Sequence, residues 1–197
     1  MEQPAGNKIT GNPSSHPALS VKWVEDFPDI PLNRNEAYKL RVTSKGVEIE
    51  AITETGVYRA IQTLRQLTEK KGNGIAITGC EITDWPAFRI RGFMQDVGRT
   101  YISTDELKRE IAILARYKIN VFHWHLTENQ AWRLQSKVFP MRNDSVNTTR
   151  QPGKYYTLEE ARELAAFCKQ HHVLLIPEID MPGHSAAFVR TFRHDMQ

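Results

Sequence analysis

The sequence predicts an α/β fold with two domains: a small α+β domain in residues 1–86, followed by alternating strands and helices in residues 87–197. Two observations carry this prediction. The residues up to Pro86 combine alternating apolar and polar positions, typical of strands, with one helical apolar face. The later residues read as strand, helix, strand, helix and strand, and such a series predicts right-handed crossovers and a parallel sheet.

The first domain is predicted from four segments. Residues 1–20 are rich in Pro, Ser, Asn and Gly and predict a loose entry segment. Residues 37–53 alternate about a turn at residues 44–46 and predict a β-hairpin. Residues 56–70 place apolar side chains on one helical face, and residues 74–86 predict one further strand.

The second domain is predicted from five segments. Residues 88–99, 119–126 and 173–180 read as strands, and residues 103–118 and 157–172 read as helices. Each helix begins with a capping box, in which Ser or Thr is followed three residues later by Glu. The last strand is almost continuously apolar, as expected of a parallel strand that is buried on both faces.

Polar residues come after each of the three predicted strands of the second domain. They are Arg99, residues 127–133 and residues 180–184. Parallel α/β sheets and barrels bind ligands and carry out chemistry at the carboxyl ends of their strands. We therefore expect these three groups to form one site.

Four of these polar residues are the strongest candidates. Arg99 could bind hydroxyls or a carboxylate through its forked guanidinium, or it could only pair with Asp96. Glu128 is a candidate substrate contact. Asp180 and His184 flank a Pro-Gly turn, and a carboxylate beside an imidazole can fix its tautomer and tune its charge. The structural alternative is a capping aspartate and a hydrogen-bonded structural histidine.

His123 and His125 form a second, separate candidate. They lie two residues apart on a predicted strand and therefore project from the same face. Metal ligands on barrel strands have this spacing, as in metal-dependent amidohydrolases. We favour the simpler interpretation, a pair of hydrogen-bonded interior residues, because the motif is short.

Composition argues against several classes of protein. The 26 basic and 23 acidic residues give a net charge of +3 and are scattered in both signs, so neither nucleic acid nor a membrane surface is an expected partner. No apolar run approaches the length of a membrane span. The sequence also lacks a phosphate-binding glycine loop, a G-x-S-x-G elbow and an HExxH motif.

The length of the second domain leaves two architectures open. A complete eight-fold barrel takes about 250 residues. Residues 87–197 are fewer, so they predict either a small open sheet or a truncated barrel.

Three strings in the second domain carry a family resemblance: RIRGFMQDVGR, KINVFHWHLTENQAWRL and YYTLEEARELAAFCKQHHVLLIPEIDMPGHS. In order and spacing they resemble the glycoside hydrolases of family 20, the β-N-acetylhexosaminidases. GVYRAIQTLRQL is similar to the helix of the small α+β domain that precedes the catalytic barrel in that family.

The resemblance implies a (β/α)8 barrel of which this chain holds the first three strands and two helices, so that it ends before the barrel closes. It also implies hydrolysis of terminal β-linked N-acetylglucosamine or N-acetylgalactosamine by substrate-assisted retention, without a metal or organic cofactor. In the family, a Gly-Asp-Glu type motif on the fourth strand supplies the general acid. These 197 residues lack that motif, so the isolated chain is expected to be inactive.

The resemblance also implies roles for the candidate residues. Arg99 matches the arginine that binds sugar hydroxyls, Glu128 and His184 match a pair that tunes the general acid, and Asp180 matches a supporting aspartate. The family more often has two aspartates where this chain has Glu128 and Asn129, and more often a histidine where it has Thr100.

Two alternative functions stay open at this point. One is a non-catalytic sugar-binding module, and the other is a metal-dependent hydrolase that uses His123 and His125 with Asp180 or His184. Family members often act outside the cytoplasm, so the resemblance favours an exported protein. Residues 1–20 contain no signal-peptide pattern.

Overall fold

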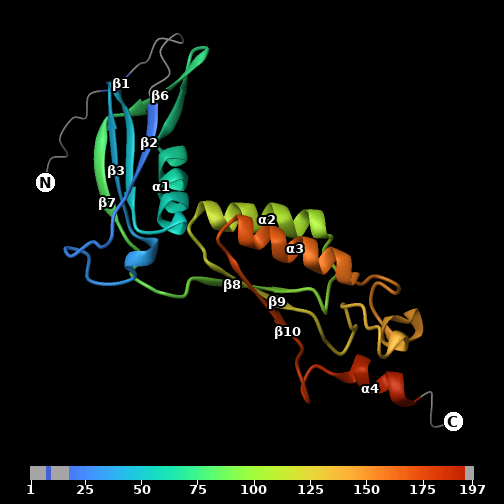
Figure 1. The fold of residues 1–197 in the computed structure, drawn as a ribbon. Coiled ribbons are helices and arrows are strands. Elements are labelled where there is room, and N and C mark those ends of the chain that lie inside the picture. Colours follow the sequence, from blue (N-terminus) through green and yellow to red (C-terminus); the bar gives the residue numbers. More distant parts are fainter. Residues whose placement is uncertain (1–7, 10–17, 194–197) are drawn as a thin grey trace, which may run out of the picture. The chain divides into compact units, whose positions relative to one another are not determined.

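The computed structural model describes residues 8–9 and 18–193, and it divides the chain into two compact units, Met1–Arg89 and Ile90–Gln197 (Figure 1). Most of the predicted entry segment lies outside the described residues. Its last residues, from Ala18, belong to a strand that the sequence pattern did not reveal. None of the helices in the described parts of the chain is both long and apolar enough to cross a lipid bilayer.

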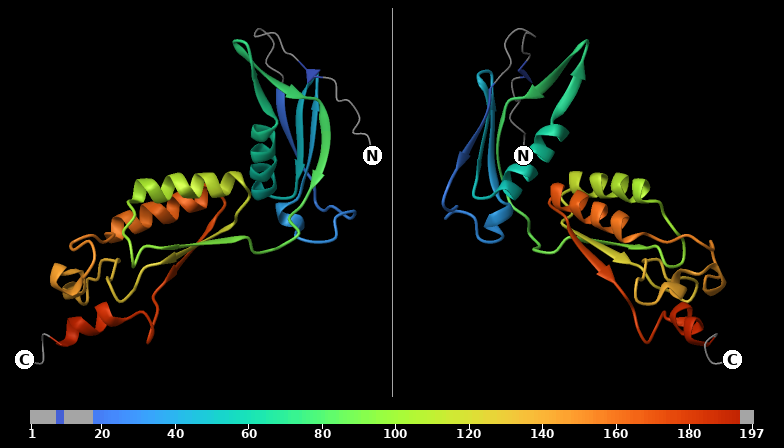
Figure 2. Two further views of the ribbon diagram at one scale, coloured as in Figure 1. Left: turned by 180° about the vertical axis from the view of Figure 1, so that it is seen from behind. Right: turned by 45° about the vertical axis from the view of Figure 1, so that its right-hand side comes forward.

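The first unit contains a four-stranded sheet in the order β2-β4-β3-β7, with one helix, α1, against one of its faces (Figure 2). The predicted hairpin is confirmed, because β3 and β4 pair antiparallel around a tight turn. The elements of this sheet are β2 (Ala18–Trp23), the short 3-10 helix η1 (Arg34–Glu36), β3 (Tyr38–Thr43), β4 (Gly46–Ala51), α1 (Glu54–Gln66) and β7 (Cys80–Asp84).

The core of the first unit lies between this sheet and α1. Alternate residues of β3 and β4 are buried, as the period-two pattern of a half-covered sheet requires. From α1, Val57, Ile61 and Leu64 pack against the buried strand residues, so its apolar face is the one that the sequence predicts. The fully or nearly buried members are Tyr38, Leu40, Val42, Val47, Ile49 and Ala60.

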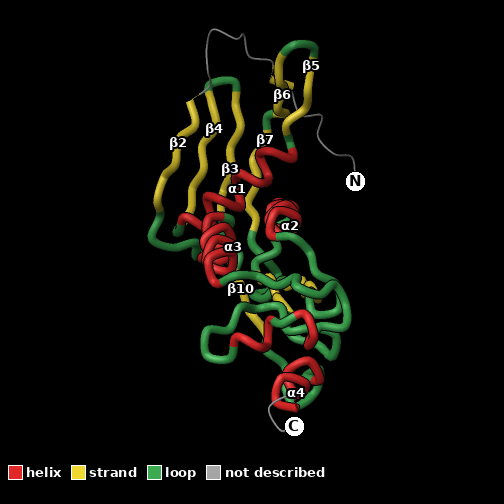
Figure 3. Tube along the Cα trace, turned by 90° about the vertical axis from the view of Figure 1, so that its right-hand side faces the viewer, coloured by secondary structure: helices red, strands yellow, loops and turns green. Residues whose placement is uncertain are grey.

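Two predictions for the first unit were wrong. The helix ends at Gln66, and Thr68–Lys71 forms strand β5 of a second, three-stranded sheet in the order β1-β6-β5, in which β1 is Lys8–Ile9. The single strand expected over residues 74–86 is two strands, β6 (Gly74–Thr78) in the second sheet and β7 in the first. Figure 3 shows the β5–β6 hairpin separately from the strands β2, β4, β3 and β7. Strand pairing decided both cases: β5 forms a hairpin with β6, and β7 pairs with the distant strand β3. The periodicity of one segment reports neither pairing.

The second unit contains a parallel sheet in the order β10-β9-β8, whose one face is covered by the helices α2 and α3 (Figures 1 and 2). The predicted β-α-β-α-β series is therefore confirmed. A further helix after β10 was not predicted. The elements are β8 (Gly92–Asp96), α2 (Thr104–Arg116), β9 (Val121–His125), the 3-10 helices η2 (Pro140–Asn143) and η3 (Ser145–Asn147), α3 (Leu158–Gln170), β10 (Leu174–Glu178) and α4 (Ala186–Arg193).

Both capping boxes form as predicted. In α2 the Ser103 hydroxyl accepts from the Glu106 amide, and the Glu106 carboxylate accepts from the Ser103 amide. Thr157 and Glu160 make the same reciprocal pair at the start of α3. Each box satisfies two amide groups that would otherwise lack partners near the start of the helix. Both helices therefore begin at the predicted residues.

Strand β10 is exposed, contrary to the expectation of burial on both faces. Leu174 keeps 61% of its surface accessible and Ile176 keeps 42%. In the described sheet β10 is an edge strand next to β9 alone, so fewer neighbours cover its apolar side chains.

The long connection between β9 and α3 is fixed by one buried arginine. Arg133 is fully buried, and its guanidinium donates to four main-chain carbonyl oxygens, those of Val97 (3.1 Å), Arg150 (2.9 Å), Gln151 (3.2 Å) and Lys154 (2.7 Å). Burial lowers the pKa of this guanidinium. Arg133 lies near the start of the connection, three of the carbonyls lie near its end, and the fourth follows β8, so Arg133 holds the two loops together.

We predict that Arg133→Leu destabilises the fold by about 3 kcal/mol, because it leaves buried carbonyl oxygens without donors. Urea unfolding followed by tryptophan fluorescence measures this change. Arg162→Leu is the matched control, since Arg162 is exposed on α3 and pairs only weakly with Glu159 at 3.4 Å. Equal unfolding midpoints for the two variants would contradict the assignment.

Candidate active site

The register of the parallel sheet brings the three polar groups to one edge. Asp96 at the end of β8 and Glu178 at the end of β10 are both register partners of His125 at the end of β9. The loops that follow therefore start at the same level. The prediction that the strand ends meet is confirmed, since Arg99, Glu128 and His184 are in direct contact.

Glu128 is the residue that joins the other two. Its side chain is only 2% exposed, yet its Oε1 accepts from Arg99 Nη2 at 2.5 Å and contacts Nδ1 of His184. Its other oxygen, Oε2, accepts from the amide of Asn129. A buried carboxylate is costly unless it is paired and hydrogen-bonded, and these partners supply both.

His184 comes from the turn between β10 and α4. The turn contains a cis peptide bond between Met181 and Pro182, and His184 itself has a left-handed backbone (φ 49°). Its Nδ1 contacts Glu128, and Arg99 Nη2 lies 3.4 Å from the same nitrogen. Because the Glu128 carboxylate only accepts and lies closer to Nδ1 than Arg99 does, we place the proton on Nδ1 and direct it to Glu128. The second ring nitrogen, Nε2, is then free to accept.

Asp180 supports this arrangement from below the ring. One of its carboxylate oxygens lies 4.0 Å from His184 Nε2, beyond hydrogen-bond distance. Its amide donates to the Thr127 hydroxyl at 2.9 Å, which ties the end of β10 to the end of β9. The Asp180 main chain thus helps to align the loops that carry Glu128 and His184.

Arg99 pairs with two carboxylates and remains open to solvent. Its Nη1 donates to Asp96 at 2.5 Å and its Nη2 to Glu128, while about half of its side chain, 49%, stays accessible. The hydrogen bond with Asp96, helped by the charges of Asp96 and Glu128, raises the pKa of the guanidinium. The expected pairing of Arg99 with Asp96 is therefore confirmed, and sugar binding by its remaining outward donors stays a prediction.

Gly98 is a site residue that the sequence reasoning missed. A Cβ atom at this position would lie 2.7 Å from the Cβ of Glu128 and 3.1 Å from its amide nitrogen. Only glycine allows the loop after β8 to approach the Glu128 main chain so closely. The signal was the glycine directly before Arg99, at the end of a predicted strand.

His123 and His125 do not form an open metal site. Nε2 of His123 and Nδ1 of His125, the latter at 3.0 Å, both face the same oxygen of Glu178, so the carboxylate occupies the point where the two rings converge. Among the described residues, no group of three or more His, Cys, Asp or Glu side chains is arranged to hold a metal ion. Of the two expected interior residues only His125 is buried, whereas the His123 side chain is 37% exposed. The metal-dependent hydrolase is not favoured.

Glu178 is ionised in this cluster. Burial alone raises its pKa, but the hydrogen bonds and charges of His125 and His123 outweigh burial, so the pKa lies below its usual value. The ring of His125 also meets the ring of His184 edge-on, with centroids 5.8 Å apart. The Glu178 cluster thus adjoins the Glu128–His184 pair on the same sheet.

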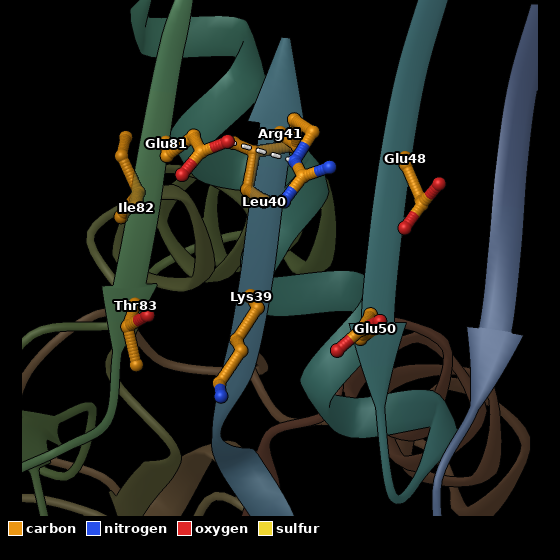
Figure 4. Close-up of a pocket in the computed structure, with 8 residues that line it drawn as sticks. All are labelled: Lys39, Leu40, Arg41, Glu48, Glu50, Glu81, Ile82 and Thr83. Carbon is orange, nitrogen blue, oxygen red and sulfur yellow. Dashed lines mark ion pairs between the residues drawn. The ribbon is translucent and has the colours of Figure 1, made fainter.

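A hollow on the four-stranded sheet of the first unit is a different feature (Figure 4). It has a volume of about 110 Å³ and lies over the ends of charged side chains of β3, β4 and β7. These charges pair across strands or with a nearby loop: Arg41 with Glu81 at 2.9 Å, Lys39 with Asp29 at 3.0 Å. Mutually paired charges on the face opposite α1 are typical of a solvated sheet surface.

An ionisable cluster at the carboxyl edge of a parallel β-α-β-α-β sheet is the arrangement of α/β-barrel enzymes. Comparison with known proteins identifies the class. Residues 88–196 match the family described as "Glycosyl hydrolase family 20, catalytic domain", and residues 4–85 match "Glycosyl hydrolase family 20, domain 2". The chain belongs to glycosyl hydrolase family 20.

Individual relatives agree with this assignment. A beta-hexosaminidase of Porphyromonas gingivalis is 39% identical over 204 residues, which cover 97% of this chain and 24% of that protein. A beta-hexosaminidase of Vibrio furnissii is 37% identical, covering 78% of this chain and 28% of that protein. The chain thus spans about a quarter of the length of these relatives.

Solved structures give the same result. An exo beta-N-acetylglucosaminidase of Vibrio harveyi, crystallised with N-acetylglucosamine, superposes with a TM-score of 0.79 at 33% identity, covering 89% of this chain and 29% of that chain. A beta-N-acetylhexosaminidase of Bacteroides fragilis gives 0.78 at 32% identity, with 89% and 35% covered. The predicted fold class, a small α+β domain followed by the first three strands of a (β/α)8 barrel, is confirmed.

If the full-length protein has the hydrolase activity proposed below, we predict that Gly98→Ala lowers its kcat/KM about 10- to 100-fold, because a displacement of about 1 Å in an active site has effects of this size. Steady-state hydrolysis assays measure it. Gly74→Ala is the control, because a Cβ there meets nothing closer than 3.8 Å. A Gly98→Ala enzyme as active as the Gly74→Ala enzyme would refute the role of close packing at Glu128.

Proposed function

We propose that the full-length protein containing this chain is an exo-acting β-N-acetylhexosaminidase, and that Arg99, Glu128, Asp180 and His184 form part of its sugar pocket. The observation that carries the proposal is the contact of Arg99 and His184 with one buried carboxylate at the carboxyl edge of the sheet. The names of the relatives and the N-acetylglucosamine bound in the Vibrio harveyi structure support the substrate class.

Arg99 is suited to binding sugar hydroxyls. A guanidinium has five N–H donors, and the pairs with Asp96 and Glu128 use only part of them. Those two carboxylates fix its plane, so the remaining donors point in defined directions without further loss of side-chain freedom. A neutral hydroxyl is a suitable acceptor for these donors, because the charge of Arg99 is already matched.

Glu128 and His184 are suited to tuning a neighbouring acid. Glu128 holds the imidazole in the tautomer that carries its proton on Nδ1, and it stabilises the ring if that ring becomes positively charged. The exposed Nε2 edge could then accept a hydrogen bond from a general acid, and the charge state of the pair would set the pKa of that acid. Asp180 would support the pair through its main chain, whose amide donates to the Thr127 hydroxyl beside Glu128.

In the proposed reaction, the oxygen of the 2-acetamido group of the sugar attacks the anomeric carbon, and a carboxylic acid protonates the leaving oxygen. The chain described here supplies binding and tuning residues. The general acid would come from a strand outside these 197 residues. Residues 1–197 alone would therefore lack proton donation to the leaving group, which typically contributes about 10²- to 10⁴-fold in rate.

We predict that the full-length protein releases nitrophenol from nitrophenyl N-acetyl-β-glucosaminide, whereas the chain of residues 1–197 does not. Arg99→Ala is expected to lower kcat/KM of the full-length protein about 10- to 100-fold, since hydrogen bonds to a charged donor are worth about 1.5–3 kcal/mol. Absorbance assays of all three proteins measure this.

Two outcomes would contradict the proposal. The first is a full-length protein without this hydrolysis. The second is an Arg99→Ala protein whose kcat/KM equals that of the wild type and of Arg162→Ala, the exposed-arginine control. Arg99 would then take no part in sugar binding.

A further inference from the structure

The position of His184 depends on the helix that follows it. The hydroxyl of Ser185 donates to the Pro182 carbonyl at 2.7 Å, and the Ser185 carbonyl accepts from the amide of Val189 in α4 at 3.0 Å. The turn that carries His184 is therefore continuous with the first turn of α4. Any displacement of α4 would move the imidazole relative to Glu128.

One arginine of α4 reaches the two loops beside the site. Nη2 of Arg190 donates to the main-chain carbonyl of Asn129 at 2.7 Å and to that of Asn147 at 2.8 Å, and its Nε lies 3.3 Å from the latter oxygen. Arg190 is partly buried, and this burial lowers the pKa of its guanidinium. Asn129 directly follows Glu128, so Arg190 links the helix after His184 to the residue after Glu128.

The side chain of Asn129 makes a second link across the same gap. Its Oδ1 accepts from the amide of Ala186, the first residue of α4, at 3.2 Å. The amide of Asn129 donates to the Glu128 carboxylate. Asn129 thus bonds both to Glu128 and to the first residue of α4, which lies two residues after His184.

Apolar packing holds α4 but does not fix its position along its own axis. The guanidinium of Arg142 lies 4.5 Å from the ring centroid of Trp132 and 4.4 Å from that of Phe188 on α4. The ring of Phe188 also packs against those of Trp132 and Phe192. The ring of Phe188 is tilted by 32° to that of Trp132 and meets that of Phe192 edge-on. Hydrogen bonds to two carbonyl oxygens constrain direction more strictly than such ring contacts. The directional contacts of α4 with the loops come from Arg190 and the Ala186 amide.

We propose that Arg190 is a positioning residue of the active site: by bridging the carbonyls of Asn129 and Asn147 it fixes α4 so that His184 meets Glu128. This inference rests on the proposed hexosaminidase function. All the residues concerned belong to the second unit, within its described part. Arg190 makes no contact with the reacting atoms in this assignment and acts only through His184.

The test compares full-length Arg190→Ala, Arg190→Lys and Arg162→Ala on nitrophenyl N-acetyl-β-glucosaminide. We expect Arg190→Ala to lower kcat about 10- to 100-fold, as misplacement of a catalytic group does, with KM changed less than about threefold. Guanidinium ion at millimolar concentration should restore several-fold of the lost kcat, because it can occupy the vacated site. Arg190→Lys keeps the charge and stem but lacks the fork, so we expect an intermediate loss without rescue by guanidinium.

The outcomes are distinguishable. A wild-type enzyme without hydrolysis would overturn the proposed function and the inference with it. An active wild type, with an Arg190→Ala enzyme that loses thermal stability but keeps the kcat of Arg162→Ala, would overturn the inference alone, since Arg190 would then be only structural. If Arg190→Ala fails to fold, Arg190→Lys decides: an unchanged kcat counts against positioning, and a reduced kcat supports it.

Discussion

The site depends on a single buried charge. Glu128 is almost fully enclosed, and a carboxylate in that position is tolerated only because Arg99, His184 and a main-chain amide surround it. Removing any partner leaves the charge partly uncompensated, so these residues act as a unit. The same constraint explains the glycine before Arg99, since the loop after β8 must pass within van der Waals contact of the Glu128 main chain.

The fold meets this constraint with main-chain contacts from distant segments. The parallel register sets the three strand ends level, and Thr127 ties two of them together. Arg133 then fixes the long connection after β9, and Arg190 fixes the helix after β10, in both cases by donating to carbonyl oxygens. Arg133 and Arg190 thus cross-link loops that have little regular secondary structure, and in these contacts both bind carbonyl oxygens and not carboxylates.

Sequence patterns predicted the parts of the molecule that are governed by local rules. The capping boxes, the β3–β4 hairpin and the strand-end location of Arg99, Glu128 and His184 follow from short motifs and from the polarity of parallel sheets. Patterns failed where strand pairing or a main-chain partner decided the structure. Thr68–Lys71 continues a helical pattern but forms a hairpin with the neighbouring strand β6. Arg190 binds the main-chain carbonyls of residues 129 and 147. Every residue has such a carbonyl, so the amino-acid sequence does not indicate which ones Arg190 binds.

The claim that Glu128 and His184 act as one unit is tested most directly by a double-mutant cycle on kcat/KM of the full-length protein in the proposed hydrolysis. Glu128→Gln, His184→Gln and the combined variant are compared with the wild type. If the two side chains work together, the double variant should be no more than about threefold worse than the more damaging single variant, as is found for residues that act as a unit. Losses that multiply would show that the two residues contribute independently, and would contradict the account.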